Sequence, residues 1–271
     1  MEPRKYKYIY GPVASWRIGR SLGIDPISSA QKTCTYNCVY CQAGKTEVFP
    51  AEREVFVPTE ALIQELRQLP KVEIDYITFA GNGEPTLAKN LGEMIYAVKT
   101  IRSEKIAVIT NASLIDRRDV QEDLLLADLV VAKLDAASEA SFKKVNQPMP
   151  DLSWESVLEG LKMFRRVYQG KLSLQVMFVK SNQKNALEIA QLAAEIRPDE
   201  VEINTPLRSC GVTPLSPLDL ESITQIFCRI CGETIKIRSV YEAKRQKSNP
   251  FCVKSTEKRR GKETDLFSPK E

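Results

Sequence analysis

Short hydrophobic runs alternate along this chain with longer stretches in which hydrophobic residues recur at helical spacing. The short runs predict strands over Ile74–Ala80, Ile106–Thr110, Leu129–Leu134, Leu172–Val179 and Val201–Asn204, and a further short strand from about Ile27 towards Cys34. The longer stretches predict helices over Thr59–Leu69, Leu87–Ile101, Arg117–Leu126, Trp154–Tyr168 and Asn185–Ile196. Regular alternation of this kind favours parallel strands joined by right-handed crossovers. Six such units predict an α/β fold, an open, partial (βα)6 TIM-like barrel.

The predicted barrel covers residues 27–206 and leaves a segment at each end. Residues 1–26 form an N-terminal segment expected on the substrate side, and Tyr10–Asp25 within it is Gly-rich and loop-like. Its Arg17 and Arg20 are expected to converge on an anion such as phosphate. Residues 207–271 form a C-terminal extension that contains cysteines and a basic tail.

Composition places the chain among ordinary globular proteins. Its 271 residues are 43% hydrophobic and 27% charged, which is typical of globular domains. No apolar run approaches the roughly 18–20 residues that span a bilayer, and no apolar segment follows the basic N-terminus as in a secretory signal. We therefore expect a cytoplasmic protein with no membrane partner, in which cysteines bind metal more readily than they form disulfides.

Positive charge is concentrated near the C-terminus. The formal net charge is +4, yet Lys236–Lys262 alone contains ten Lys and Arg against two Glu. A local surplus of this kind is typical of a surface that binds a polyanion, and Lys258–Lys262 is the part expected to contact an RNA backbone. A solvated terminus without a partner is the alternative.

Three cysteines within eight residues carry the clearest chemical signal. Cys34, Cys38 and Cys41 are spaced C-x3-C-x2-C, and Tyr40 directly precedes the last of them. Three thiolates on one loop can hold three irons of a [4Fe–4S] cubane and leave the fourth iron open to a small molecule, whereas an electron-transfer ferredoxin supplies four cysteines. The chain has no histidine, which excludes zinc sites with His ligands and histidine-based acid–base catalysis. Three unrelated thiols, or part of a zinc knuckle, are the alternatives.

Further chemistry follows the predicted strands, at the edge where a barrel carries its reactive groups. The motif Gly81–Pro85 follows the strand Ile74–Ala80; its glycines permit close approach of a ligand and its carboxylate suits an ammonium group. A plain strand–helix turn is the alternative. Lys133 and Asp135 lie at the rim, where a surface ion pair explains them equally well.

The cysteine spacing with its aromatic, together with Gly81–Pro85, resembles the signature of the radical S-adenosylmethionine (SAM) superfamily. The resemblance implies the partial barrel and a [4Fe–4S] cluster with an open iron that chelates SAM, held by Cys34, Cys38 and Cys41. It also implies reductive cleavage of SAM to methionine and a 5′-deoxyadenosyl radical, which abstracts hydrogen from a substrate. The SAM contacts that it implies are Tyr40, Gly81, Asn82, Gly83, Glu84, Pro85, Asn111, Lys133 and Asp135. In the segment that begins at Asn111, Ala112 stands where the family usually has Gly.

Most of the chain resembles one branch of this superfamily, grouped with the wyosine-base (imidazoguanosine tRNA) synthases, through Tyr10–Asp25, Gln42, Ser239–Ala243 and Arg259–Gly261. With the basic tail, this makes a modified tRNA base the first candidate substrate; a protein or peptide that is modified or activated is the second. The resemblance also implies an external one-electron donor such as flavodoxin or ferredoxin. A non-catalytic iron–sulfur electron carrier or RNA-binding module is a third hypothesis. The intact Gly81–Pro85 motif argues against it, because a carrier needs no amino-acid pocket.

Four more cysteines follow the last predicted barrel strand: Cys210, Cys228, Cys231 and Cys252. The C-x-x-C spacing of Cys228 and Cys231 lets two thiolates share one metal, and four thiolates would complete a second [4Fe–4S] cluster or a four-cysteine zinc site. Leu218–Cys231 also has the pattern of an amphipathic helix, in which these thiols would simply pack. The sequence leaves an auxiliary cluster, a zinc site and packed or free thiols open.

Overall fold

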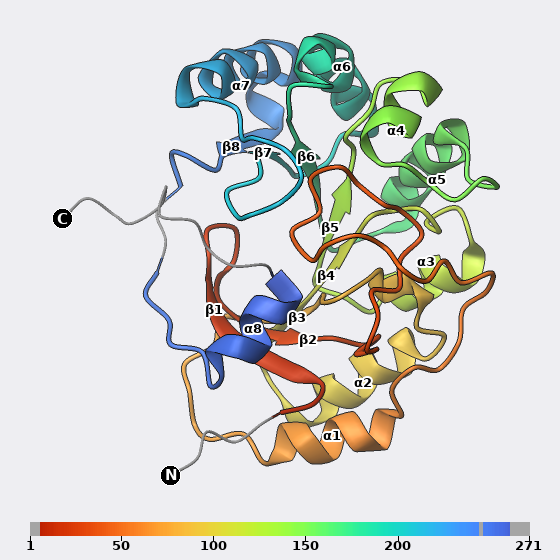
Figure 1. The fold of residues 1–271 in the computed structure, drawn as a ribbon, viewed down its shortest axis with the longest axis vertical. Helices are drawn as coiled ribbons and strands as arrows, with labels where there is room; N and C mark the ends of the chain where they lie inside the picture. Colours follow the sequence, from red (N-terminus) through yellow and green to blue (C-terminus); the bar gives the residue numbers. More distant parts are fainter. Residues whose placement is uncertain (1–5, 244–245, 261–271) are drawn as a thin grey trace.

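Strands from all three predicted parts of the chain share one curved sheet in the computed structural model, which describes residues 6–243 and 246–260 (Figure 1). The strands are β1 (Ile9–Ser15), β2 (Gly19–Ile24), β3 (Tyr76–Phe79), β4 (Lys105–Thr110), β5 (Leu129–Lys133), β6 (Lys171–Met177), β7 (Glu200–Asn204) and β8 (Lys236–Ser239). They follow one another in sequence order; β1 and β2 are antiparallel, and every later pair of neighbours is parallel. This confirms the partial barrel.

All the helices except the last follow the parallel strands and cover the outer side of the sheet, whereas the last packs on β1 beside the central cavity (Figure 1). They are α1 (Thr59–Arg67), α2 (Leu91–Ile101), α3 (Arg118–Leu124), α4 (Glu139–Val145), α5 (Trp154–Val167), α6 (Ala186–Ile196), α7 (Pro217–Cys231) and α8 (Val253–Arg260). All the predicted helices are present, while α4 and α8 were not predicted. The helix expected from Leu87 begins at Leu91, because Pro85–Leu87 forms a separate 3-10 turn. Among the described residues, none of the helices has the length and apolar character needed to cross a membrane.

The N-terminal segment corrects one prediction. Tyr10–Asp25 was expected to be a loop, but most of it forms the hairpin β1–β2. No strand leads from Ile27 to Cys34; β2 instead begins the parallel part of the sheet. The glycines of this segment were interpreted as a sign of a loop. A Cβ on Gly23 would lie 2.1 Å from a ring atom of Tyr10. Glycine at this position of the strand therefore permits close packing and does not form a turn.

The two arginines of this segment do not converge on one anion, contrary to the prediction. Arg20 forms ion pairs with Glu73 and Asp75. Arg17 faces the interior of the barrel, where its Nε lies 3.5 Å from a carboxylate oxygen of Glu202. Each guanidinium is therefore directed to its own carboxylates.

The described part of the basic C-terminal segment is folded against the barrel, so the alternative of a solvated terminus is wrong for it. β8 lies within this segment, and α8 packs on β1. The Phe251 amide donates to the Gly11 carbonyl at 2.6 Å, and the Gly11 amide donates to Thr256 Oγ1 at 3.2 Å. Lys244, Arg245 and Lys262 lie outside the described residues.

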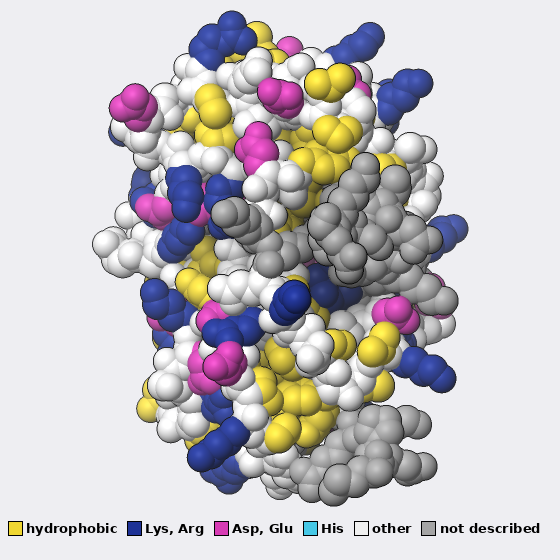
Figure 2. All heavy atoms as spheres, turned by 90° about the vertical axis from the view of Figure 1, so that its left-hand side faces the viewer, with side chains coloured by type: hydrophobic (Ala, Val, Ile, Leu, Met, Phe, Trp, Pro, Cys, Tyr) yellow, Lys and Arg dark blue, Asp and Glu magenta, His cyan; other side chains and the backbone are white. Residues whose placement is uncertain are grey.

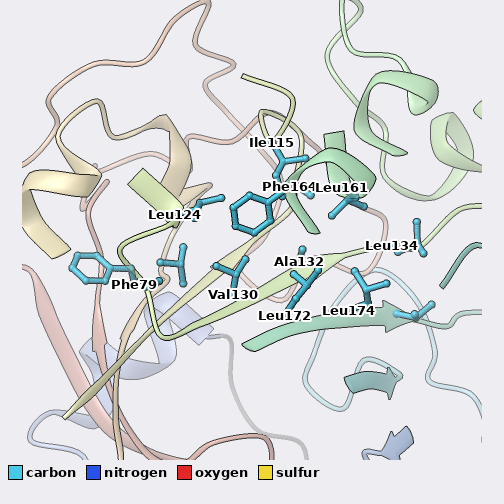
Figure 3. Close-up of a cluster of buried hydrophobic side chains, with 14 of the residues drawn as sticks. Phe79, Ile115, Leu124, Val130, Ala132, Leu134, Leu161, Phe164, Leu172 and Leu174 are labelled. Atoms are coloured by element: carbon cyan, nitrogen blue, oxygen red, sulfur yellow. The ribbon is translucent and has the colours of Figure 1, made fainter. Parts of the chain in front are cut away.

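The main core lies between the sheet and the outer helices (Figure 3). Val130 of β5 and Leu172 of β6 point toward Leu161 and Phe164 of α5. Because side chains alternate along a strand, the residues between them face the barrel interior, and Lys133 at the end of β5 is one of these. Strand alternation thus separates an apolar outer layer from the chemistry inside.

Replacement of Phe164 by Ala should lower the free energy of unfolding by about 3–5 kcal/mol, because it removes a fully buried ring and leaves a cavity. Met163→Ala is the matched control on the same helix: its side chain is 52% exposed, and we expect a change within about 0.5 kcal/mol. Denaturant titration of both variants checks this. Equal losses would show that α5 does not carry the core as described.

Candidate active site

The cysteine loop lies across the mouth of the barrel. It connects β2 to α1 and passes over the carboxyl ends of the strands, where it is the red-to-orange segment in the centre of Figure 1. A cavity of about 270 Å3 opens beneath it. The loop contributes Tyr40 and Cys41 to the lining, and the strand ends contribute Gly81, Lys133 and Asn204. The structure therefore brings the cysteine motif, part of the Gly81–Pro85 motif and Lys133 to one site.

Each thiol of the loop has a nitrogen donor within reach. Lys32 Nζ lies 2.9 Å from Cys41 Sγ and is itself buried. The side-chain Nδ2 of Asn111 lies 3.5 Å from Cys34 Sγ. The amide of Asn146 lies 3.6 Å from Cys38 Sγ, and so the three donors come from three different segments of the chain. Donors directed at sulfur stabilise negative charge there, as iron-bound thiolates require.

Burial raises the pKa of two of these thiols. The pKa of Cys34 rises to about 12, through desolvation and the charge of Glu84. The pKa of Cys38 rises to about 11, through desolvation and the charge of Asp135. Metal ligation requires the thiolate, so iron must displace a proton from each sulfur and binding strengthens as the pH rises. The surrounding N–H groups offset part of this cost.

Backbone pairing fixes the Gly81–Pro85 motif against the cysteine loop. The Glu84 amide donates to the Thr33 carbonyl at 3.2 Å, directly before Cys34. A Cβ on Gly83 would lie 2.0 Å from that same carbonyl oxygen, so this position requires glycine. The motif is therefore more than a turn between β3 and the next helix, because its second glycine sets the distance between two parts of the site.

Glu84 is the centre of a buried hydrogen-bond network. Its Oε1 accepts from the backbone amide and hydroxyl of Thr86 at 3.0 and 2.8 Å and from the Thr110 hydroxyl at 2.6 Å. Its Oε2 accepts from the backbone amide of Asn111 at 2.7 Å. Desolvation nonetheless raises the pKa of this carboxyl, and these hydrogen bonds oppose the rise. The network joins the ends of β3 and β4.

A second polar network surrounds Tyr40. The Tyr40 hydroxyl donates to Asp135, and the Asn146 amide donates to the same carboxylate oxygen at 2.9 Å. The other Asp135 oxygen accepts from the Met177 amide at 2.7 Å. Lys133 Nζ lies 4.9 Å from the centre of the Tyr40 ring. Lys133 and Asp135 are thus not a simple surface ion pair: the carboxylate is buried and orients the tyrosine.

Comparison with known proteins decides the family. The family model of the radical SAM superfamily matches residues 28–193. The chain belongs to the radical SAM superfamily. It is 39% identical over 238 residues to a UPF0026 protein of Synechocystis sp., an alignment that covers 84% of this chain and 89% of that protein. The chain is therefore an enzyme of SAM and a [4Fe–4S] cluster, and it needs an external electron donor.

Solved radical SAM structures share the fold. A radical SAM methyltransferase from Sphaerobacter thermophilus superposes with a TM-score of 0.57 at 15% identity, over 81% of this chain and 66% of that one. An archaeal TYW1 superposes with a TM-score of 0.54 at 15% identity, over 78% of this chain and 72% of that one. At this identity the likeness concerns the barrel alone. The match to the family model confirms the resemblance of the sequence to the radical SAM superfamily.

The loop fits a radical SAM cluster better than a single metal ion. Within residues 6–243 and 246–260, no three Cys, Asp or Glu side chains converge on one point, as a single ion would require. Ligands of a cubane each bind a different iron and need no common point. Three thiols on one loop, each beside an N–H donor, match that donor set, and Cys41 among them lines the cavity.

The structure does not bring the four C-terminal cysteines together. Cys210 packs beside Tyr40 and Met177 near the first site. Cys231 is buried on α7 near Ala190 of α6, where burial raises its pKa to about 11, and Cys228 is exposed one turn away. Cys252 directly precedes α8, which lies well apart from α7 (Figure 1). The alternative of packed or free thiols fits this arrangement, and an auxiliary cluster has no prepared site among the described residues.

The backbone explains one departure from the family pattern. Ala112, which replaces the usual Gly after Asn111, has φ +65°. A left-handed backbone favours glycine because a Cβ crowds the following carbonyl. In this chain, Ala112 therefore adopts the left-handed conformation that glycine adopts more readily.

Sequence reasoning missed several residues of the site. Lys32 and Asn146 donate to cysteine sulfurs, and Asp25 accepts from the Asn82 amide at 3.3 Å. Lys32 had a weak signal, since it lies two residues before Cys34. Asn146 lies on the unpredicted α4 side of the barrel, far from every motif in the sequence. The individual SAM contacts stay predictions.

Glu84→Ala should lower the free energy of unfolding by at least about 2 kcal/mol, because it leaves the buried Thr110 hydroxyl and Asn111 amide without their acceptor. The four hydrogen bonds of Glu84 give it a part in folding in addition to the SAM contact that the sequence predicts. Thr110→Val is the matched control: it removes one donor and leaves the carboxylate its other partners, so we expect about 1 kcal/mol. Denaturant titration measures both, and an undiminished stability in Glu84→Ala would contradict the network.

Proposed function

We propose that Cys34, Cys38 and Cys41 hold the [4Fe–4S] cluster and that this enzyme cleaves SAM reductively at the mouth of its barrel. When bound, the reduced cluster would supply the one electron for this cleavage, whose products would be methionine and a 5′-deoxyadenosyl radical able to remove hydrogen from the substrate. The observation that carries this proposal is the placement of three thiols on one loop, each beside its own N–H donor, where Cys41 and Gly81 line the same cavity.

Side chains of the chain itself would stabilise the [4Fe–4S] cluster and orient SAM. Lys32, Asn111 and Asn146 stabilise charge on the sulfurs. Glu84 Oε1 already accepts three hydrogen bonds, whereas Oε2 accepts one. A carboxylate oxygen accepts about two hydrogen bonds in its plane, so Oε2 is the atom that we expect to accept from the SAM ammonium. Tyr40, fixed by Asp135, presents its ring to the cavity.

We further propose that the substrate is a base in tRNA and that flavodoxin or ferredoxin supplies the electron. Two observations favour a nucleic acid over a peptide. The described residues that line the cavity include Arg and Lys but neither Asp nor Glu. In the basic C-terminal segment, α8 brings Arg259 and Arg260 to the lining of the cavity. A cationic cavity suits an anionic substrate.

Anaerobically reconstituted protein should cleave SAM when dithionite is added, and 5′-deoxyadenosine measured by chromatography reports it. Cys34→Ala, Cys38→Ala and Cys41→Ala should each abolish this product, because each exposes a second iron and destabilises the cluster. Cys228→Ala, an exposed thiol on α7, is the matched control and should retain it. Cleavage that survives loss of any of the three loop cysteines would refute the assignment.

Iron content tests the C-terminal cysteines. The wild type should bind about four irons per chain, the content of one cubane. A variant with all three loop cysteines replaced by Ala should bind none, because the other four are not gathered into a site. Quantification of iron and zinc in both proteins decides this. About four irons, or stoichiometric zinc, left in the triple variant would show that these cysteines come together on metal binding.

A further inference from the structure

The central cavity carries an excess of positive charge. Its cationic lining residues are Arg17, Lys133, Arg208, Arg259 and Arg260, and none of the described lining residues is Asp or Glu. Bound cofactors do not balance this excess, because SAM carries a sulfonium and an ammonium against one carboxylate, and an oxidised cubane on three thiolates contributes a single negative charge. Two of these cations, Arg17 and Arg259, pair with the buried carboxylates of Glu202 and Asp25.

Arg259 holds α8 in place. Its Nε lies 3.0 Å from Asp25 Oδ2, and the two side chains are only 9% and 2% exposed. The same Asp25 oxygen accepts from the Asn82 amide, within the Gly81–Pro85 motif. The guanidinium also lies 5.5 Å from the centre of the Tyr10 ring. This buried pair fixes the last turn of α8 against the site, and Arg260, the next residue, lines the cavity as a result.

Arg208 reaches the same place from the other edge of the sheet. It follows β7, and its Nη1 donates to the side-chain oxygen of Gln42 at 3.0 Å, one residue after Cys41. Burial and Asp25 raise the pKa of Tyr10 to about 12, while the charges of Arg260, Arg259 and Arg208 oppose the rise. The positive charges of these three guanidinium groups therefore all favour the ionised form of the Tyr10 hydroxyl.

Arg208 and Arg260 also line a second hollow. This outer groove of about 250 Å3 lies between β1 and α8, and with Ala14 the two arginines line both it and the central cavity. Glu257 is the acidic residue among its described lining. The two guanidinium groups thus lie at the boundary between the surface groove and the interior, where a substrate must pass.

We propose that Arg208 and Arg260 form a phosphate-binding subsite at the mouth of the cavity, which anchors a phosphate ester of the substrate. The inference rests on the proposed function, because it assigns the substrate class of that same site. Guanidinium groups match phosphate oxygens with paired hydrogen bonds. A phosphate dianion carries more charge and more acceptor oxygens than a monocarboxylate, so it can accept from two guanidinium groups at once. The ester is carried either by a free nucleotide or by a nucleotide within an RNA chain.

The subsite is local, not a general basic surface. Figure 2 shows the side of the molecule on the left of Figure 1, and Lys and Arg side chains there are interspersed with Asp and Glu. A uniform basic face would bind any polyanion, and loss of any one cation would weaken it equally. A local subsite predicts that only the cations at the boundary matter.

The test compares cations on one helix. Arg260→Gln and Arg208→Gln remove a charge at the boundary, whereas Lys258→Gln removes the same charge from a position of α8 that does not line the cavity. The probes are uridine 5′-monophosphate, uridine without phosphate and an unmodified tRNA transcript, titrated calorimetrically into the reconstituted full chain at fixed ionic strength. Uridine is chosen to avoid the adenosine site of SAM.

We expect each arginine variant to bind the phosphate probes about ten- to a hundredfold more weakly, the effect of losing one charge-assisted contact. Lys258→Gln should bind as the wild type does, and uridine should not distinguish the variants. For tRNA, each lost contact should also flatten the log–log salt dependence by roughly 0.7–0.9. Tight uridine monophosphate binding identifies a free nucleotide as the source, whereas arginine-dependent binding of tRNA alone identifies RNA.

Equal losses in Lys258→Gln and the arginine variants would overturn the subsite in favour of a general basic surface, and unchanged binding in the arginine variants would overturn it as well. Circular dichroism and iron content verify folding. If a glutamine variant does not fold, Arg260→Lys or Arg208→Lys, which keeps the charge and loses the paired donors, replaces it at the same position. SAM cleavage by the wild type is measured separately. Cleavage without an arginine effect defeats the subsite alone, and an arginine effect without cleavage defeats the proposed function alone.

Discussion

Backbone pairing between the cysteine loop and the end of β3 is the constraint on which the rest of the site depends. Glu84 donates from its amide to Thr33, and Gly83 leaves room for that carbonyl. The pairing places Cys34 against Asn111, which the buried Glu84 carboxylate holds in turn. One close backbone contact thus positions together Cys34, the Asn111 side chain that donates to its sulfur, and the Glu84 carboxylate.

The barrel interior is divided into an apolar base and a polar upper layer. Ile18, in the turn of the N-terminal hairpin, packs on Leu129 and Val131 and fills the lower end. One layer higher, Lys133 donates to Gln175 at 3.2 Å, and Gln175 is paired in register with Glu202 of β7. Among the described residues, apolar side chains therefore close the cavity below, and it opens at the edge that carries the cysteine loop, next to the groove between β1 and α8.

The two ends of the chain complete a site that the barrel alone would leave open. The hairpin β1–β2 and α8 pack together, and the Arg259–Asp25 pair ties both to the loop that contains Asn82. A buried ion pair contributes little net stability after desolvation, but loss of one partner is costly because it leaves an uncompensated charge. Its value here is positional: it fixes which cations face the substrate.

The sequence by itself determined the barrel and the radical SAM family, because the patterns that indicate both depend on local spacing. Hydrophobic periodicity placed β4 and α5 to within a residue or two at each end, and C-x3-C-x2-C needs only one loop. Only the tertiary structure revealed the hairpin hidden by its glycines, Asn146 beside Cys38, and the separation of Cys228 from Cys252. Those features depend on contacts between residues far apart in the chain, and such contacts leave no periodic signal in a single sequence.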